Sequence, residues 1–164
     1  MVTRLIDRID KWLSTNRADY YATLQAGATP QELDAFEAKF RLSLPPDFRE
    51  LYQWRNGQSG SASLENNRMF SSLDEIASTK EMLDGMIGTD FDDPKWWRQG
   101  WVPFLANGGG DHLCVDLTAE DSGTPGQLLE FYHDDETRSV EYPNLEAWLT
   151  ELADSMENGS LIVT

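Results

Sequence analysis

The second half of the chain carries short, β-rich segments separated by turns that contain glycine. The segments expected to be strands are Val102–Leu105, His112–Leu117, Gln127–His133 and Arg138–Tyr142. Connections this short join neighbouring strands as hairpins, whereas parallel strands need a crossover of about a dozen residues or more. No helix-length segment alternates with these strands, which argues against a doubly wound nucleotide-binding fold. The pattern therefore predicts a mainly antiparallel sheet.

Apolar residues near the N-terminus recur with the period of a helix. Leu5, Ile9 and Leu13 recur at helical spacing and predict an amphipathic helix over about 3–15. A second helical turn is expected over 18–25. These apolar stripes need a surface to cover, so we expect the N-terminal helices to pack on the sheet.

Two capping boxes mark the starts of further helices. Thr29 with Glu32, and Ser72 with Glu75, have the spacing at which side chains at a helix start bond the free backbone amides. A third helix begins at the Leu44-Pro45-Pro46-Asp47 break and is expected to end at Asn56-Gly57, and a last one follows Asn144. The chain is thus predicted to be α+β, with N-terminal helices packed on an antiparallel sheet of four to six strands, closed by a C-terminal helix.

The length and composition indicate one globular domain over residues 1–164. No apolar run approaches the ~20 residues that cross a bilayer. The N-terminus lacks the apolar region of a signal peptide. Cys114 is the only cysteine, so an internal disulfide is impossible, and we expect a buried, unreactive thiol. These features predict a cytoplasmic protein.

The charge balance limits the kinds of partner. Asp and Glu number 29 against 13 Lys and Arg, a net charge of −16. Such a field repels nucleic acid and anionic membrane, and it speeds encounter with a basic protein. We therefore expect neither nucleic acid nor membrane as a partner. The oligomeric state cannot be read from the sequence.

Neither candidate for catalytic or metal chemistry has the expected pattern. Gly108-Gly109-Gly110-Asp111 lacks the Lys-Ser or Lys-Thr pair and the helix of a phosphate-binding loop, and predicts instead a tight turn in which Asp111 bonds local amides. His133 precedes Asp134-Asp135-Glu136, but this spacing matches neither a zinc site nor a calcium loop. His112 is expected to be an ordinary strand residue. The sequence predicts no catalytic residue, no metal ligand and no cofactor.

Four motifs, taken in order, resemble those of one known family. They are Thr29–Glu32 with Leu33 and Phe36, then Leu44–Leu51 running to Asn56-Gly57, then Trp101–Phe104 with Gly109–Asp111 and Val115–Leu117, and finally Gly126–Leu129 through Trp148-Leu149. In this order and spacing the chain resembles the SUKH superfamily, which includes fungal cell-wall-synthesis regulators of the Smi/Knr type and many bacterial immunity proteins. The resemblance covers 28–152, leaving 1–27 as a helical extension and 81–95 as a variable insert.

The resemblance implies an α+β fold that binds a protein and performs no catalysis. For a bacterial source it implies an immunity protein that binds and neutralises a toxin. Because many such toxins act on nucleic acid and are basic, a strongly acidic chain would complement them. The alternative is an intracellular regulatory scaffold of the cell-wall-regulator type. A third reading, from a different class, is a hydrolase that uses His133 to Glu136.

Two acidic segments are the predicted partner-binding surface. Asp92 and Asp93 flank the Trp96-Trp97 pair, and Asp134-Asp135-Glu136 form an acidic turn. Adjacent aromatic residues cannot both face inward on a strand, so one tryptophan is expected to be exposed. An exposed indole supplies affinity at interfaces, while carboxylates steer a basic partner. A single surface requires that the two segments lie close together, which is an assumption and not a result of the sequence.

Overall fold

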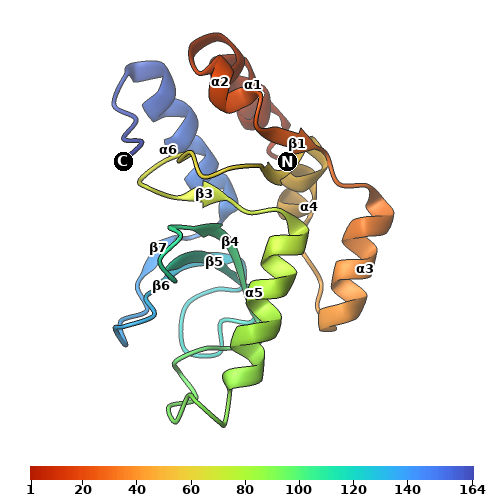
Figure 1. Cartoon of the computed structure of the whole chain (residues 1–164), viewed down its shortest axis with the longest axis vertical. Coiled ribbons are helices and arrows are strands. Elements are labelled where there is room, and N and C mark those ends of the chain that lie inside the picture. The colour runs from red at the N-terminus through yellow and green to blue at the C-terminus, as the bar shows by residue number, and fades with distance from the viewer.

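A computed structural model describes residues 1–164 and has the predicted α+β class, with the sheet mainly antiparallel and a helix at the C-terminus (Figure 1). The helices are α1 (Thr3–Asn16), α2 (Ala18–Tyr21), α3 (Pro30–Phe40), α4 (Pro46–Trp54), α5 (Leu73–Met86) and α6 (Leu145–Asn158). The strands are β1 (Leu24–Ala26), β2 (Arg55–Gln58), β3 (Met69–Phe70), β4 (Trp101–Ala106), β5 (His112–Asp116), β6 (Gln127–Phe131) and β7 (Val140–Tyr142). Both predicted capping boxes, at Thr29 and at Ser72, are present.

The main sheet has five antiparallel strands in the order β3-β4-β5-β6-β7. Strands β4 to β7 follow one another through short connections and pair as hairpin neighbours, as predicted, whereas β3 pairs with β4 across a long connection that contains α5. Side chains alternate between the two faces of a strand, so Leu113 and Val115 of β5 belong to the larger core and Cys114 to a smaller one. The larger core includes residues of α1, α4, α6 and the start of α5, and the smaller one includes the end of α5 and the segment 87–100.

Two short strands lie where the sequence pattern had predicted helical structure. Leu24–Ala26 forms β1, and α4 ends at Trp54, so that Arg55–Gln58 pairs with β1 as β2. Asn56-Gly57 therefore lies in a strand and does not end the helix. Gly57 has φ +70°, and a Cβ there would lie 2.3 Å from the Ser72 backbone nitrogen. This pairing between distant segments overrides the local helical pattern.

The N-terminal helix α1 shares the larger core with the rest of the molecule. Ile6, Ile9 and Leu13 are buried in it. Helix α1 lies beside α6 in Figure 1, and Arg8 on α1 reaches across to Asp154 at 2.7 Å. The extension 1–27 is thus integrated into the fold by packing and by charge.

The last residues of the chain follow α6 without forming a strand and contact a loop. The backbone amides of Asn66 and Asn67 donate to the Ile162 and Val163 carbonyls, both at 2.7 Å. No helix is both long and apolar enough to cross a membrane.

Candidate functional site

The segment between α5 and β4, residues 87–100, is held in place by Trp97. This indole is 1% exposed and meets the rings of Trp101 and Phe131 edge-to-face, with centroids 5.4 and 5.2 Å away. Its Nε1 donates to the Asp84 carboxylate at 2.8 Å. Trp97 was included in the predicted partner-binding set, and its burial corrects that assignment. It anchors the segment and cannot reach a partner.

A buried lysine strengthens this anchor. The Lys80 ammonium lies 3.1 Å from the Asp84 carboxylate and also donates to the Gln99 carbonyl, so it links α5 to the end of the segment. Its side chain is 1% exposed. Burial lowers the pKa of Lys80, while the negative charge of Asp84 opposes that shift. Only the i,i+4 spacing of Lys80 and Asp84 indicates this pair in the sequence.

Arg138 joins this segment to the β6–β7 loop. Its Nε and Nη2 donate to the Trp96 carbonyl at 3.1 and 2.9 Å, and its Nη1 donates to the Asp135 carbonyl at 2.6 Å. The guanidinium lies over two rings, 4.5 Å from the centroid of Phe131 and 4.9 Å from that of Trp96. The two acidic segments, whose proximity had been assumed, are therefore joined directly. Sequence reasoning had not singled out Arg138.

The half-buried Trp96 is the accessible member of the tryptophan pair. Together with Phe91, whose ring centroid is 6.1 Å from that of Trp96, it lines an open pocket of about 380 Å³. Asp90, Asp92, Asp93 and His133 complete the lining.

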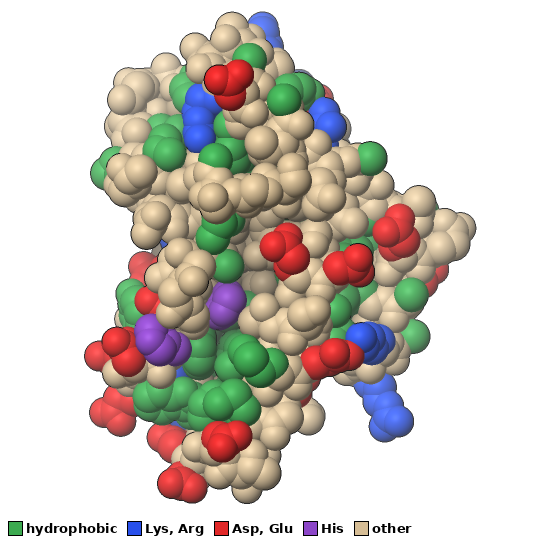
Figure 2. Space-filling view, viewed as in Figure 1, with side chains coloured by type: hydrophobic (Ala, Val, Ile, Leu, Met, Phe, Trp, Pro, Cys, Tyr) green, Lys and Arg blue, Asp and Glu red, His purple; other side chains and the backbone are tan.

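We call Asp90–Asp93, Trp96 and His133–Glu136 the acidic–aromatic face. Figure 2 shows hydrophobic side chains gathered beside the two histidines, with acidic side chains around them. All six carboxylates of this face are exposed, and none forms an ion pair within the chain. The carboxylates are those of Asp90, Asp92, Asp93, Asp134, Asp135 and Glu136. The face thus carries negative charge beside apolar surface.

The histidine of this face pairs with a residue from another loop. His133 Nδ1 lies 2.8 Å from Asp111 Oδ1, and the His133 backbone amide donates to the same oxygen at 3.0 Å. The hydrogen bond to Asp111 raises the pKa of His133. No hydroxyl or thiol bonds the ring, so it has no nucleophile beside it. The hydrolase alternative grouped His133 with Asp134, Asp135 and Glu136. In the structure the ring pairs with Asp111, and of those three residues only Asp134 has a ligand atom grouped with it, within 4.8 Å.

One cluster could hold a metal ion. Asp111, His133 and Asp134 each offer a ligand atom, and these atoms lie within 4.8 Å of one another. The two latter residues are exposed, and the only hydrogen bond to the His133 ring comes from Asp111. Exposed carboxylates of this kind bind divalent cations only when more oxygen ligands converge on them.

The glycine-rich turn has the predicted shape with a different side chain at its centre. Gly108 and Gly110 adopt φ values of +81° and +102°. The Asn107 side-chain oxygen, and not Asp111, accepts from the local amides of Gly109 and Asp111, at 2.8 and 3.1 Å. The predicted bonding by Asp111 was wrong because its carboxylate is turned toward Asn107 and His133.

His112 and Cys114 are strand residues, as predicted. Burial lowers the pKa of His112 to about 4, and its Nδ1 is buried without a hydrogen-bond partner. Cys114 is fully buried, which raises the pKa of its thiol. Neither side chain is suited to proton transfer or nucleophilic attack at neutral pH.

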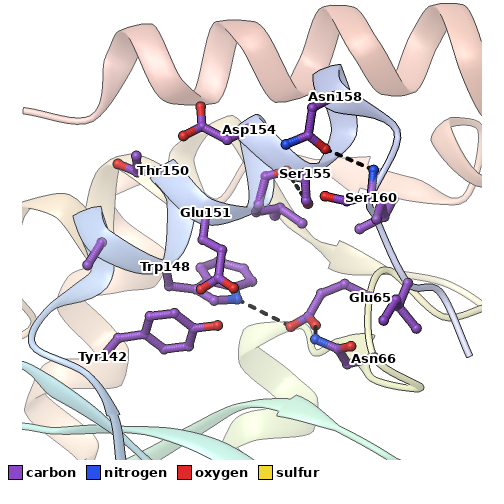
Figure 3. A pocket seen from close by; sticks show the side chains of 14 residues that line it. Glu65, Asn66, Tyr142, Trp148, Thr150, Glu151, Asp154, Ser155, Asn158 and Ser160 are labelled. Carbon is purple, nitrogen blue, oxygen red and sulfur yellow. Dashed lines mark hydrogen bonds between the residues drawn. The ribbon is translucent and has the colours of Figure 1, made fainter.

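A second pocket of about 420 Å³ lies between α6, the C-terminal residues and the loop at Glu65 (Figure 3). Glu65 is 3% exposed and accepts from Trp148 Nε1 at 3.2 Å. The same carboxylate also contacts Arg68, at 3.2 Å, and accepts from the Asn66 side-chain amide. Trp148 is 2% exposed, so it offers no ring face to a ligand. The Glu65–Trp148 contact spans 83 residues and carries no local sequence signal.

Comparisons with known proteins agree with the resemblance seen in the sequence. The chain is 25% identical to the cell wall biosynthesis/cell cycle regulator smi1 of Schizosaccharomyces pombe, over 95% of this chain and 36% of that protein. It is 24% identical to a glucan synthesis regulatory protein of Neurospora crassa, over 96% of this chain and 38% of that protein. It is 21% identical to the cell wall assembly regulator SMI1 of Saccharomyces cerevisiae, over 93% of this chain and 40% of that protein.

These relatives are named as regulators and not as enzymes. The chain spans less than half of their length. The model of the SMI1 / KNR4 family (SUKH-1) matches residues 27–151. The chain belongs to this family.

Proposed function

We propose that this chain is a non-enzymatic protein-binding domain that acts in regulation by docking a basic partner on its acidic–aromatic face. The observation that carries the proposal is the set of six exposed carboxylates, free of ion pairs, around a half-buried indole and its pocket. Apolar surface rimmed by polar groups is typical of interaction sites. Negative charge at the rim steers a basic protein, and a desolvated tryptophan supplies affinity.

A regulatory role is favoured over toxin immunity by the names of the relatives. Three of them are named for cell-wall or glucan-synthesis regulation. The chain spans only part of those proteins, so the idea that it shares their regulatory role is a proposal. We expect the domain to act in the cytoplasm on a protein partner, without a cofactor.

Toxin neutralisation is the second candidate. The observation in its favour is the net charge of −16, which would complement a basic toxin. Co-expression with the product of a neighbouring toxin gene separates the two roles. Survival of the cells that depends on this chain supports immunity, and death of cells that express both proteins excludes it.

The docking proposal is tested by affinity capture from the source organism followed by mass spectrometry. The bait carries either the native face or three substitutions in it, Trp96→Ala with Asp134→Lys and Asp135→Lys. The matched control, Asp7→Lys with Asp19→Lys, changes the charge equally on α1 and α2, at the opposite end of the long axis in Figure 1. We expect a basic protein that the native and control baits retain and the face variant loses. Equal capture by all three baits contradicts the proposal.

A further inference from the structure

The pocket in the acidic–aromatic face combines two kinds of wall. Phe91 and Trp96 supply aromatic surface, and Asp90, Asp92 and Asp93 supply three carboxylates. Its volume of about 380 Å³ is near the lower end for ligand sites, roughly 300–1,000 Å³, and suits one long side chain.

The backbone around these carboxylates is arranged in a defined turn. Asp93 Oδ1 accepts from the Lys95 amide at 2.8 Å, and the Asp93 carbonyl accepts from the Trp96 amide at 3.0 Å. Trp97 fixes the end of the turn in the small core. The Asp93 carboxylate and the Trp96 backbone are therefore held in place before any partner arrives, which lowers the entropic cost of binding.

The Trp96 ring already stacks against a guanidinium of the chain itself. Arg138 lies over both Trp96 and Phe131, at 4.9 and 4.5 Å from the ring centroids. A guanidinium is planar, weakly hydrated and able to stack on aromatic rings while it forks toward a carboxylate. An arginine from outside would find both kinds of contact in the pocket.

A metal ion is a poorer fit to the three pocket aspartates. The one group of three possible ligand side chains whose atoms all lie within 4.8 Å is Asp111, His133 and Asp134. The carboxylates of Asp90, Asp92 and Asp93 are therefore too dispersed to share one small cation. They suit an extended, delocalised charge.

We infer that this pocket receives an arginine side chain of the partner protein, stacked on the aromatic wall and paired with the aspartates. The inference rests on the proposed function for the existence of a partner protein. The choice of arginine as the bound side chain rests on the pocket alone. It adds Asp90, Phe91 and His133 to the surface that the sequence predicted.

The test is an NMR titration of the isotope-labelled full chain with the peptide acetyl-Gly-Arg-Gly-amide at low ionic strength. The citrulline peptide of the same length is the neutral control, because it keeps the shape of arginine and lacks its charge. We expect saturable shifts at the Trp96 indole NH and at the amides of residues 90–93, and no saturation with citrulline. Asp90→Asn with Asp92→Asn should weaken arginine-peptide binding about fivefold or more, while Asp7→Asn with Asp19→Asn leaves it unchanged.

Equal shifts with both peptides, or shifts spread over the surface without saturation, overturn the inference. If the peptide fails to bind while partner capture still depends on the face, the arginine pocket is wrong and the docking proposal stands. If the peptide binds but no partner depends on the face, the proposed function fails and the pocket assignment stands.

Discussion

At the scale of single residues, the buried ring of His112 makes the stability of the fold depend on pH. Burial lowers the pKa of His112 from 6.5 to about 4. A hydrogen bond between the ring and the Leu105 backbone and the negative charge of Asp111 oppose this shift. Between these two values the unfolded chain takes up a proton that the folded chain does not. The fold therefore loses stability as the pH falls through that window, by roughly 2 kcal/mol from pH 7 to pH 5.

His112→Phe tests this dependence, because phenylalanine keeps a flat ring beside Phe131 and cannot be protonated. Urea unfolding at pH 7 and pH 5 should show a smaller loss for the variant than for the native chain. His133→Gln is the control with the opposite sign. The raised pKa of His133 gives stability that is present below its ordinary pKa and is lost as the pH rises through the folded value. An unchanged loss in His112→Phe would refute this account.

A second prediction at this scale concerns the Arg138 guanidinium. Lysine keeps the positive charge but lacks the planar fork whose separate nitrogens donate to the Trp96 carbonyl and the Asp135 carbonyl. Arg138→Lys should cost about 1–2 kcal/mol of unfolding free energy and speed hydrogen exchange in residues 90–98. Arg4→Lys, at an exposed position on α1, is the matched control. Unchanged exchange in residues 90–98 would show that Arg138 does not join the two loops.

The role of a single side chain could be predicted only where the residue that it contacts lies close to it in the sequence. The tight turn at Gly108–Asp111 was predicted, but Asn107 and not Asp111 bonds its amides. The exposed member of the Trp96-Trp97 pair could not be chosen, because the choice depends on Asp84 and Phe131 in other elements.

At the scale of elements, the helices with capping boxes were predicted closely, because a cap is decided by residues three positions apart. Helix α3 begins at Pro30, directly after the cap residue Thr29, as the capping box predicted. The β1–β2 ribbon was missed because it pairs Leu24 with Gln58, and nothing local in either segment indicates the other.

The interaction between α5 and segment 87–100 gives a prediction at this scale. Trp97→Ala removes one of the two tryptophans of the small core and leaves the Asp84 carboxylate with Lys80 alone. Unfolding free energy should fall by about 3–5 kcal/mol. Met82→Ala, at an exposed position on α5, should change it by less than about 0.5 kcal/mol. A loss for Trp97→Ala as small as for Met82→Ala would show that the small core does not anchor the segment.

At the scale of the whole molecule, the residues that build the cores and the carboxylates of the acidic–aromatic face lie in different parts of the fold. The apolar residues build two cores on opposite faces of one sheet, and both cores follow from the alternation of side chains along β4–β6. Fold class was therefore predictable from the pattern of strands, whereas the acidic–aromatic face depends on loops brought together by Arg138. Loops of this kind carry function in many folds because a rigid sheet positions them.

The central claim is that this face steers and holds a basic partner, and the association rate of the captured partner over a series of salt concentrations tests it most directly. Stopped-flow mixing compares the native chain, Asp134→Lys with Asp135→Lys, and the control Asp7→Lys with Asp19→Lys. We predict that the face variant associates about tenfold more slowly at low salt, with a flatter salt dependence, while the control stays close to the native chain. A face variant whose association rate and salt dependence match those of the control would contradict the account.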